Sequence, residues 1–416
     1  MAKVVITAIG SRGDIAPMVA IGSRLQAAGH EVVLTANPMF HDLIADSGLR
    51  HLPHGSDEGA GRAEGGGPGE VPNPVKEVMR YLSPKGMQAT GESLLAALKD
   101  EPADILLLSP FAELAGHPLA EARGIPSIGV RFQPMSTTAL YPPSLLGAWS
   151  AAPAVNRFAG RFAAAAVDRV YGKPVAAFRR QLGLPKVSTK ALRRRRTEAE
   201  WPILHGYSPM VAPRPQDWRP GLDIVGYWWP PRPLDWEPPE DLVRFLAAGP
   251  PPVYVGFGSL PMPKAEAERV SGVIGEALRK AKVRGIVQAG WAGLAVASDD
   301  VITIGEVPHD WLFDHLGAVV HGCGAGTAGA GLRAGLPVVA LPNSGGDQPF
   351  WAQRLHELGV SAGTLSRPKM TADSLAAAIT TAMTEPGLRV NAKAVAAKLA
   401  DEDGAGAVVT AVERLV

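Results

Sequence analysis

The sequence is poor in several features that mark particular classes of protein. Its single cysteine, Cys323, excludes an internal disulfide framework and favours a reducing compartment. A net charge of +1 gives no strong electrostatic case for nucleic acid or an anionic membrane as the main partner. No apolar run is long enough to span a bilayer, and the N-terminus carries no signal-peptide pattern. We therefore expect a soluble cytoplasmic protein without stable membrane insertion.

Short apolar runs alternate with helical patterns along the chain. Val4–Ile9 reads as a buried parallel strand, Pro17–Ala28 has helical periodicity, and Glu31–Ala36 reads as the next strand. This is a βαβ unit with a right-handed crossover. The alternation restarts at Val253–Phe257 after a stretch dense in proline and tryptophan. The fold class expected is α/β, with two Rossmann-like doubly wound domains facing across a cleft.

We expect three parts in a chain of 416 residues. Residues 1–220 form an N-terminal acceptor-binding domain, and residues 221–400 form a C-terminal nucleotide-sugar-binding domain. Residues 401–416 form a C-terminal helix that packs back on the N-terminal domain. A Gly/Pro-rich stretch, Pro53–Pro74, has almost no large apolar residues and is expected to be a mobile surface loop.

A glycine-rich turn, within Val319–Thr327, follows an apolar run and precedes an alanine-rich helical segment. Such a strand–turn–helix presents backbone N–H groups and a helix N-terminus to a phosphate. Gly258-Ser259 follows another strand and offers similar donors, while Asp347-Gln348 offers a carboxylate and an amide suited to sugar hydroxyls. Together they indicate a nucleotide-sugar site. Taken alone, the glycine turn can also be interpreted as a tight connection between a strand and a helix. Asp347-Gln348 alone can be interpreted as a turn with a helix cap.

These motifs resemble those of GT-B glycosyltransferases that act on sterols, macrolides and glycopeptide antibiotics. The resemblance extends in order over nearly the whole chain. The segments that carry it are Ile9–Asp14 with Pro17, Phe132–Met135, Val255–Ser259, Val307–Phe313, Val319–Thr327 and Gly346–Trp351.

The resemblance implies roles for individual residues. Asp14 is the general base against the acceptor hydroxyl; the alternative is that it only caps the helix that begins near Ile15. The family needs no metal, and we see no metal-ligand constellation in the sequence. The acceptor-binding residues implied are Arg12, Phe132, Gln133 and Met135. The donor-binding residues implied are Ser259, Val307, His321, Gly324, Ala325, Gly326, Thr327, Asp347 and Gln348.

The glycine turn departs from the family at one contact. The family reads His-His-Gly-Gly-Ala-Gly-Thr, so Gly322 stands where the second histidine contacts the donor diphosphate, and Cys323 stands at a glycine. Losing a charged donor there removes roughly 1.5–3 kcal/mol of binding. The lost contact to the diphosphate would be replaced by the His321 side chain in another orientation, or by the backbone N–H groups alone. Cys323 is read as a small packed thiol, with a nucleophile near a helix N-terminus as the alternative.

Other conspicuous residues have two interpretations. Trp228 and Trp229 are expected to pack at the domain junction or to contact the acceptor, and Trp291 to stack on the nucleotide base or pack in the core. The run Arg193–Arg196 is a solvated helix end or a contact for an anionic ligand.

The function expected is inverting transfer of a sugar from a UDP- or TDP-sugar to a hydroxyl of an apolar small molecule, with no further cofactor. Two alternatives remain: another reaction on the same fold, such as sugar-nucleotide epimerisation, and a catalytically silent helper or binding protein. A nicotinamide dehydrogenase is disfavoured, because Gly10-Ser11-Arg12-Gly13 lacks the full dinucleotide fingerprint.

Overall fold

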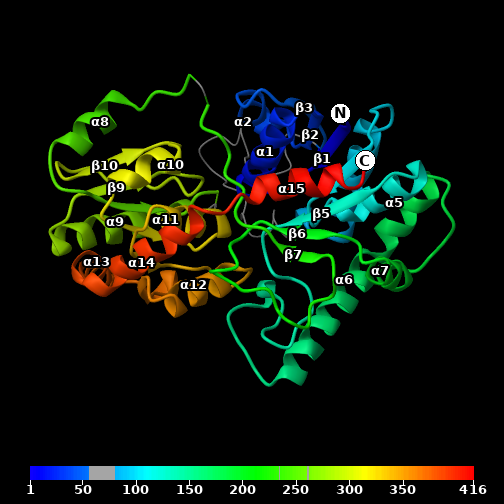
Figure 1. Ribbon diagram of the computed structural model, residues 1–416. Coiled ribbons are helices and arrows are strands. Elements are labelled where there is room, and N and C mark those ends of the chain that lie inside the picture. Colours follow the sequence, from blue (N-terminus) through cyan, green and yellow to red (C-terminus); the bar gives the residue numbers. More distant parts are fainter. Residues whose placement is uncertain (56–79, 234, 260–261) are drawn as a thin grey trace.

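Two parallel sheets flanked by helices form the protein, as the computed structural model shows (Figure 1). The structure describes residues 1–55, 80–233, 235–259 and 262–416. The first sheet has seven strands in the order β3-β2-β1-β4-β5-β6-β7, and the second has six in the order β10-β9-β8-β11-β12-β13. This arrangement confirms the α/β class with two Rossmann-like domains. The predicted loop Pro53–Pro74 falls mostly outside the described residues.

The first sheet is built from short apolar strands with helices packed on both sides. Its central strands, β1 and β4, are buried throughout except for Lys3 at the start of β1. The strands are β1 (Lys3–Thr7), β2 (Glu31–Ala36), β3 (Arg50–Pro53), β4 (Ile105–Leu108), β5 (Ser127–Arg131), β6 (Ile203–His205) and β7 (Leu222–Ile224). The helices are α1 (Arg12–Ala27), α2 (His41–Ala45), α4 (Pro84–Ala97), α5 (Glu113–Arg123), α6 (Pro153–Gln181) and α7 (Thr189–Glu198).

The second sheet repeats this plan with its own core. Alternating helices cover it, and β8 and β11 at its centre are fully buried. Its strands are β8 (Val253–Gly256), β9 (Gly285–Gln288), β10 (Val301–Ile304), β11 (Ala318–His321), β12 (Val338–Ala340) and β13 (Ser361–Thr364). Its helices are α8 (Glu240–Ala247), α9 (Lys264–Ala281), α10 (His309–Leu312), α11 (Ala325–Arg333), α12 (Gln348–Glu357), α13 (Ala372–Thr384) and α14 (Pro386–Leu399), and the chain ends with α15 (Gly404–Glu413).

The strand order places a topological switch point in each sheet. In the first sheet the chain runs outward from β1 in one direction and from β4 in the other; in the second, β8 and β11 have the same relation. Ligands bind in open α/β sheets at the carboxyl ends of the strands beside such a point. The segments that follow β1, β8 and β11 are therefore the ones that the topology brings to a binding cleft.

Two helices begin earlier than their periodicity predicts. α1 starts at Arg12 rather than near Pro17, because Ser11 and Asp14 form a capping box that extends the helix towards its N-terminus. α12 starts at Gln348 rather than Gln353. Asp14 and Gln348, which the sequence indicated as binding residues, therefore lie in the first turns of α1 and α12.

The connection between the sheets contributes a strand that periodicity did not reveal. β7 pairs in parallel with β6 and lies within the stretch expected to be a linker. A strand of only three residues carries too little alternation to be recognised. The first sheet therefore continues to Ile224, beyond the expected boundary at residue 220.

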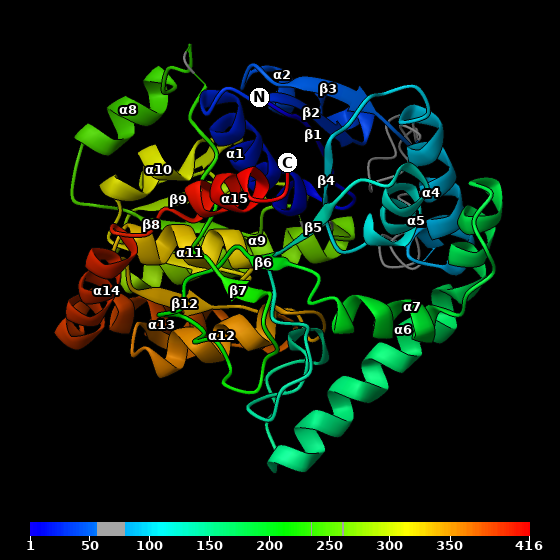
Figure 2. The ribbon, with the colours of Figure 1, turned by 45° about the vertical axis from the view of Figure 1, so that its right-hand side comes forward.

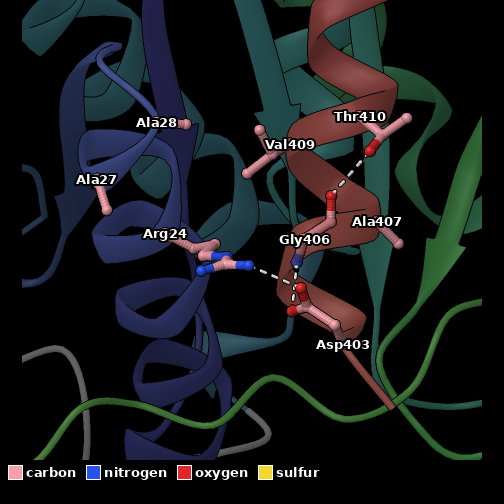
Figure 3. A pocket seen from close by; sticks show the side chains of 8 residues that line it. All are labelled: Arg24, Ala27, Ala28, Asp403, Gly406, Ala407, Val409 and Thr410. Carbon is pink, nitrogen blue, oxygen red and sulfur yellow. Dashed lines mark hydrogen bonds and ion pairs between the residues drawn. The ribbon is translucent and has the colours of Figure 1, made fainter. Parts of the chain in front are cut away.

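The chain returns to the first domain at its end, where the red α15 lies beside the blue α1 (Figure 1). Val408 and Val412 of α15 are fully buried in one core cluster with residues of α1. Asp403 caps α15 and forms an ion pair with Arg24, with 2.7 Å between the charged atoms, beside a shallow hollow at the end of α1 remote from the cleft (Figure 3). Among the described helices, none is both long and apolar enough to cross a membrane.

Candidate active site

Asp14 lies in the first turn of α1, at the carboxyl edge of the first sheet. One of its carboxylate oxygens, Oδ2, accepts hydrogen bonds from the Ser11 backbone N–H at 2.7 Å and from the Ser11 hydroxyl at 3.0 Å. The other oxygen, Oδ1, receives no hydrogen bond from the described residues. Gly10 lies against this carboxyl so closely that a Cβ there would come within 2.3 Å of Oδ2. The cap thus fixes the carboxylate and leaves one oxygen available.

The environment of Asp14 shifts its acidity into a range useful for proton transfer. Burial, aided by the negative charge of Asp347, raises its pKa from 3.8 to about 6 against the opposing effect of the two Ser11 hydrogen bonds. A carboxylate with a pKa near neutrality is ionised at pH 7 and still basic enough to accept a proton. The helix-cap role and a base role are therefore compatible in this residue.

The glycine turn leads directly into an uncapped helix N-terminus. β11 ends at His321, and α11 begins at Ala325 with Gly324 as its N-cap. Because glycine has no side chain, the first N–H groups of α11 have no side-chain acceptor. Gly326 is exposed and Thr327 half-buried. This turn offers backbone donors and the positive end of a helix dipole to an anion.

His321 supports the turn from below. Its side chain is buried, and its Nδ1 accepts a hydrogen bond from the Cys323 backbone N–H at 3.0 Å. Burial lowers its pKa to about 3, with His309 nearby adding to the effect, so the imidazole is neutral. Its Nε2 is buried without a partner in the described structure. The imidazole positions the backbone of the turn and does not reach into the cleft as a cation.

Cys323 adopts a conformation that explains why glycine is common at its place. Its φ is +60°, in the left-handed region that side chains rarely occupy. The thiol is fully buried, and burial raises its pKa to about 12. A thiol with that pKa is not a nucleophile at neutral pH, so the packed-thiol interpretation holds.

Asp347 and Gln348 lie where α12 begins and are tied to its first turn. Asp347 Oδ2 accepts a hydrogen bond from the Trp351 indole N–H at 2.7 Å, and Gln348 Oε1 accepts one from the Asn343 backbone N–H at 2.8 Å. Burial raises the pKa of Asp347, although hydrogen bonds from Trp351 and Gln133 counteract the rise. Both side chains are half-buried and keep polar atoms for a ligand.

Contacts from the two domains converge on this region. Arg12 of α1 forms an ion pair with Glu306, which follows β10, at 3.2 Å. The Gln133 side chain, after β5, hydrogen-bonds to Asp347. Helices α1 and α11 contact each other, and Ala325 packs against the cores of both domains. The structure therefore brings the predicted acceptor-side and donor-side residues to one place.

The remaining predicted site residues have different settings. Ser259 is half-buried and follows Gly258 after β8, and Val307 is buried just after Glu306. Met135 is half-buried. Phe132, by contrast, lies in the core, where its ring packs edge-on against Trp228 with centroids 5.8 Å apart. The Phe132 ring is therefore covered by protein rather than exposed to solvent.

Three residues near the predicted site had no role assigned from the sequence. Ser11 orients Asp14, Glu306 pairs with Arg12, and Trp351 orients Asp347. The Ser11–Asp14 and Asp347–Trp351 contacts are local, because each pair lies within one helical turn. The Glu306 contact, like the edge-on packing of Tyr141 against Phe350 with centroids 5.2 Å apart, joins segments far apart in sequence.

The conspicuous tryptophans have mainly structural contacts, and in the run Arg193–Arg196 two arginines form ion pairs, Arg193 with Asp168 and Arg194 with Glu198. Trp228 donates from its indole N–H to the Gly404 carbonyl at 3.1 Å, which joins the interdomain connection to α15. Trp229 lies under the Arg333 guanidinium, and Trp291 packs against the core of the first domain. No cluster of three or more histidine, cysteine or acidic residues able to hold a metal occurs in the described part of the chain.

Comparisons with known proteins agree with this geometry at both ends of the chain. Residues 4–100 match the model of the glycosyltransferase family 28 N-terminal domain. Residues 286–415 match the model described as erythromycin biosynthesis protein CIII-like, C-terminal domain. The two matched regions contain Asp14 and the glycine turn, respectively.

Individual relatives match almost the whole length of this chain. The chain is 34% identical over 426 residues to the sterol 3-beta-glucosyltransferase UGT80A2 of Arabidopsis thaliana, a match covering 98% of this chain and 64% of that protein. It is 35% identical over 412 residues to the vancomycin aglycone glucosyltransferase of Amycolatopsis orientalis, covering 97% of this chain and 95% of that enzyme.

A solved structure shares the whole fold. Glycosyltransferase VinC, crystallised in complex with DTDP, matches with a TM-score of 0.68 and 19% identity, over 99% of each chain. At that identity the likeness establishes the two-domain architecture. Since the relatives match along almost the entire sequence and this structure has the same fold, the chain belongs to the GT-B glycosyltransferase family that includes sterol and glycopeptide-antibiotic glucosyltransferases.

Proposed function

We propose that the protein is an inverting glycosyltransferase that moves a sugar from a UDP- or TDP-sugar to a hydroxyl of an apolar small molecule. The observation that carries this proposal is that Asp14 lies close enough to Asp347 for that charge to raise its pKa, on a helix that also contacts α11 with its uncapped N-terminus. A base, a sugar-binding carboxylate and an anion-binding helix end are the three groups that such a transfer needs.

The proposed reaction is a single displacement. The free Oδ1 of Asp14 takes the proton of the acceptor hydroxyl while that oxygen bonds to the anomeric carbon. The bond from the anomeric carbon to the diphosphate oxygen breaks, so the configuration inverts. The departing nucleoside diphosphate carries the negative charge, which the N–H groups of Ala325, Gly326 and Thr327 stabilise. Asp347 and Gln348 hold the sugar hydroxyls, with Trp351 fixing the carboxylate.

Substrate classes are proposed from the relatives and from the donor turn. The VinC complex contains DTDP, which supports a nucleoside diphosphate donor, and the relatives' names specify a sterol and a vancomycin aglycone as acceptors. Ser259 and the backbone at Val307 would contact the diphosphate and the base, and Gln133 and Met135 the acceptor. The histidine absent at Gly322 weakens the donor contact without removing the backbone donors.

The test is a mass-spectrometric screen of purified protein with UDP- and TDP-sugars against a panel of hydroxylated lipophiles. A mass gain of one sugar on the acceptor, lost in Asp14→Asn, supports transfer. Calorimetry of the same protein with each nucleotide sugar separates the alternatives. Donor turnover without an acceptor would favour an epimerase-like reaction, and undetectable nucleotide-sugar binding would contradict the proposal.

A further inference from the structure

Positive charge is concentrated in one segment of a chain whose overall net charge is only +1. Residues 139–198 contain 12 of the 41 lysines and arginines but 2 of the 40 acidic residues. Several of these cations are exposed and make no ion pair with the described residues. They are Arg161, Arg169, Lys173, Arg180, Lys186, Lys190 and Arg195. A net charge near zero therefore conceals a strongly basic segment that includes α6 and α7.

Exposed apolar side chains gather in the same segment. Of the 15 large hydrophobic residues that are exposed in the described structure, 9 lie between residues 140 and 170. Phe158 and Phe162, whose rings stack with centroids 6.3 Å apart, are 69% and 65% exposed. Four others, Leu140, Leu145, Leu146 and Trp149, precede α6 in the chain. Such a concentration marks an interaction surface.

Helical geometry places exposed apolar side chains and exposed cations along one side of α6. Val155, Phe158 and Phe162 are spaced by three and four residues and so share one side of the helix. The same exposed stripe continues through Arg169, Lys173 and Arg180, while Asn156, Gly160, Pro174 and Phe178 are buried on the opposite side. The stripe is thus apolar in its first half and basic in its second.

The apolar end projects away from the body of the molecule. Both views show the start of α6 extending from the two domains, with α7 beside its other end (Figures 1 and 2). The segment before it also reaches the cleft, because Tyr141 packs against Phe350 close to Asp347. The apolar surface is therefore continuous in sequence with the wall of the proposed acceptor site.

We propose that this face of α6, with the segment 140–149, docks on an anionic lipid bilayer surface. Aromatic and aliphatic side chains enter the boundary between headgroups and acyl chains, and the flanking cations contact lipid phosphates. A second copy of the chain fits less well, because a symmetric contact would bring two sets of unpaired cations together. Docking itself needs neither the sugar donor nor the acceptor. The further idea that the bilayer supplies an apolar acceptor rests on the proposed function.

Vesicle co-sedimentation tests the proposal. The whole protein should bind vesicles of phosphatidylcholine mixed with phosphatidylglycerol. It should bind more weakly to vesicles of phosphatidylcholine alone, and binding to the mixed vesicles should weaken as the salt concentration increases. Phe158→Ser with Phe162→Ser should weaken binding about tenfold or more, and Arg169→Glu with Lys173→Glu should abolish the preference for anionic lipid. The matched control is Val390→Ser with Lys264→Glu, at exposed positions elsewhere, which should bind as the wild type does.

Hydrogen exchange on the unmodified protein supplies a test that no folding defect can obscure. Anionic vesicles should slow exchange in residues 140–173 and leave α13 and α14 unchanged. The proposal is overturned by absence of binding to anionic vesicles, or by equal losses in the control variant. Sedimentation showing a dimer that Phe158→Ser with Phe162→Ser dissociates would also overturn it, in favour of a contact between two copies.

Discussion

At the scale of single residues, the side chains proposed to act chemically also have structural roles. Asp14 caps α1 through Ser11, and the same hydrogen bonds hold its carboxylate in place. Asp347 accepts from Trp351 on the next turn of its own helix. Such restraint keeps reacting groups in position without a cost in entropy at the moment of reaction.

The pKa of Asp14 predicts how activity depends on pH. A general base must be ionised, and burial raises this pKa to about 6. The kcat/KM for the acceptor should therefore fall about tenfold for each pH unit below that value and be constant above it. A pH–rate profile measures the midpoint. A midpoint near 4, the usual value for a solvated carboxyl, would show that burial does not control the base.

Removing the charge of Asp14 should stabilise the protein. Because the folded-state pKa is raised above 3.8, this carboxyl favours folding fully below pH 3.8, and that contribution is lost as the pH rises through about 6. At pH 8, Asp14→Asn should increase the free energy of unfolding by roughly 1–3 kcal/mol, with a smaller gain near pH 5. Urea titrations measure this, with exposed Asp46→Asn as the control; an Asp14→Asn protein less stable at pH 8 would refute it.

At the scale of elements, the glycine turn combines a backbone anion site with a missing side chain. Cys323 adopts the left-handed backbone conformation, and its backbone N–H donates a hydrogen bond to His321 Nδ1. These two features stabilise the shape of the turn despite its unusual sequence. The uncapped start of α11 remains. The proposed donor contact would therefore rely mainly on backbone groups.

Gly322→His should strengthen donor binding. A Cβ at Gly322 would lie 3.4 Å from Gln348 Oε1, its nearest neighbour, so a side chain fits with small adjustment. A second imidazole near the diphosphate should improve affinity about tenfold or more, if charged. Calorimetry with UDP and TDP measures the change, and Gly322→Ala separates the imidazole from the added Cβ. Unchanged or weaker binding would show that the turn has been rebuilt for another ligand.

The sequence predicted the parts of the fold that are local and missed those that are not. An apolar run identified β2 with its observed ends, and the motifs singled out Asp14 and Asp347, which influence each other electrostatically in the structure. Capping at Ser11 moved the start of α1, and three-residue β7 lacked a recognisable pattern. The burial of Phe132, like the Arg12–Glu306 pair, depends on how segments distant in sequence meet.

At the scale of the whole molecule, the two domains are linked by more than their connecting chain. The C-terminal helix α15 leaves the second domain and packs on α1, and Trp228 in the connection hydrogen-bonds to the start of α15. Arg12 and Glu306 join the domains at the cleft. The position of Asp14 relative to the donor half therefore depends on contacts at both ends of α1.

Val412→Ala should loosen this arrangement. Val412 is fully buried between α15 and the first domain, and losing two methyl groups there should cost about 1.5–3 kcal/mol of unfolding free energy. Exposed Thr410→Ala on the same helix should change it by less than about 0.5 kcal/mol. Chemical denaturation compares the two; equal effects would show that α15 contributes little to the union of the domains.

Single-turnover kinetics of Asp14→Asn would show whether Asp14 takes the proton of the acceptor hydroxyl. With donor and acceptor both saturating, loss of a general base should make transfer about 10²–10⁴ times slower than in the wild type. Donor affinity, measured by calorimetry on the same preparation, should remain unchanged because none of the proposed donor residues lies on α1. A transfer rate close to the wild-type value would rule out Asp14 as the base.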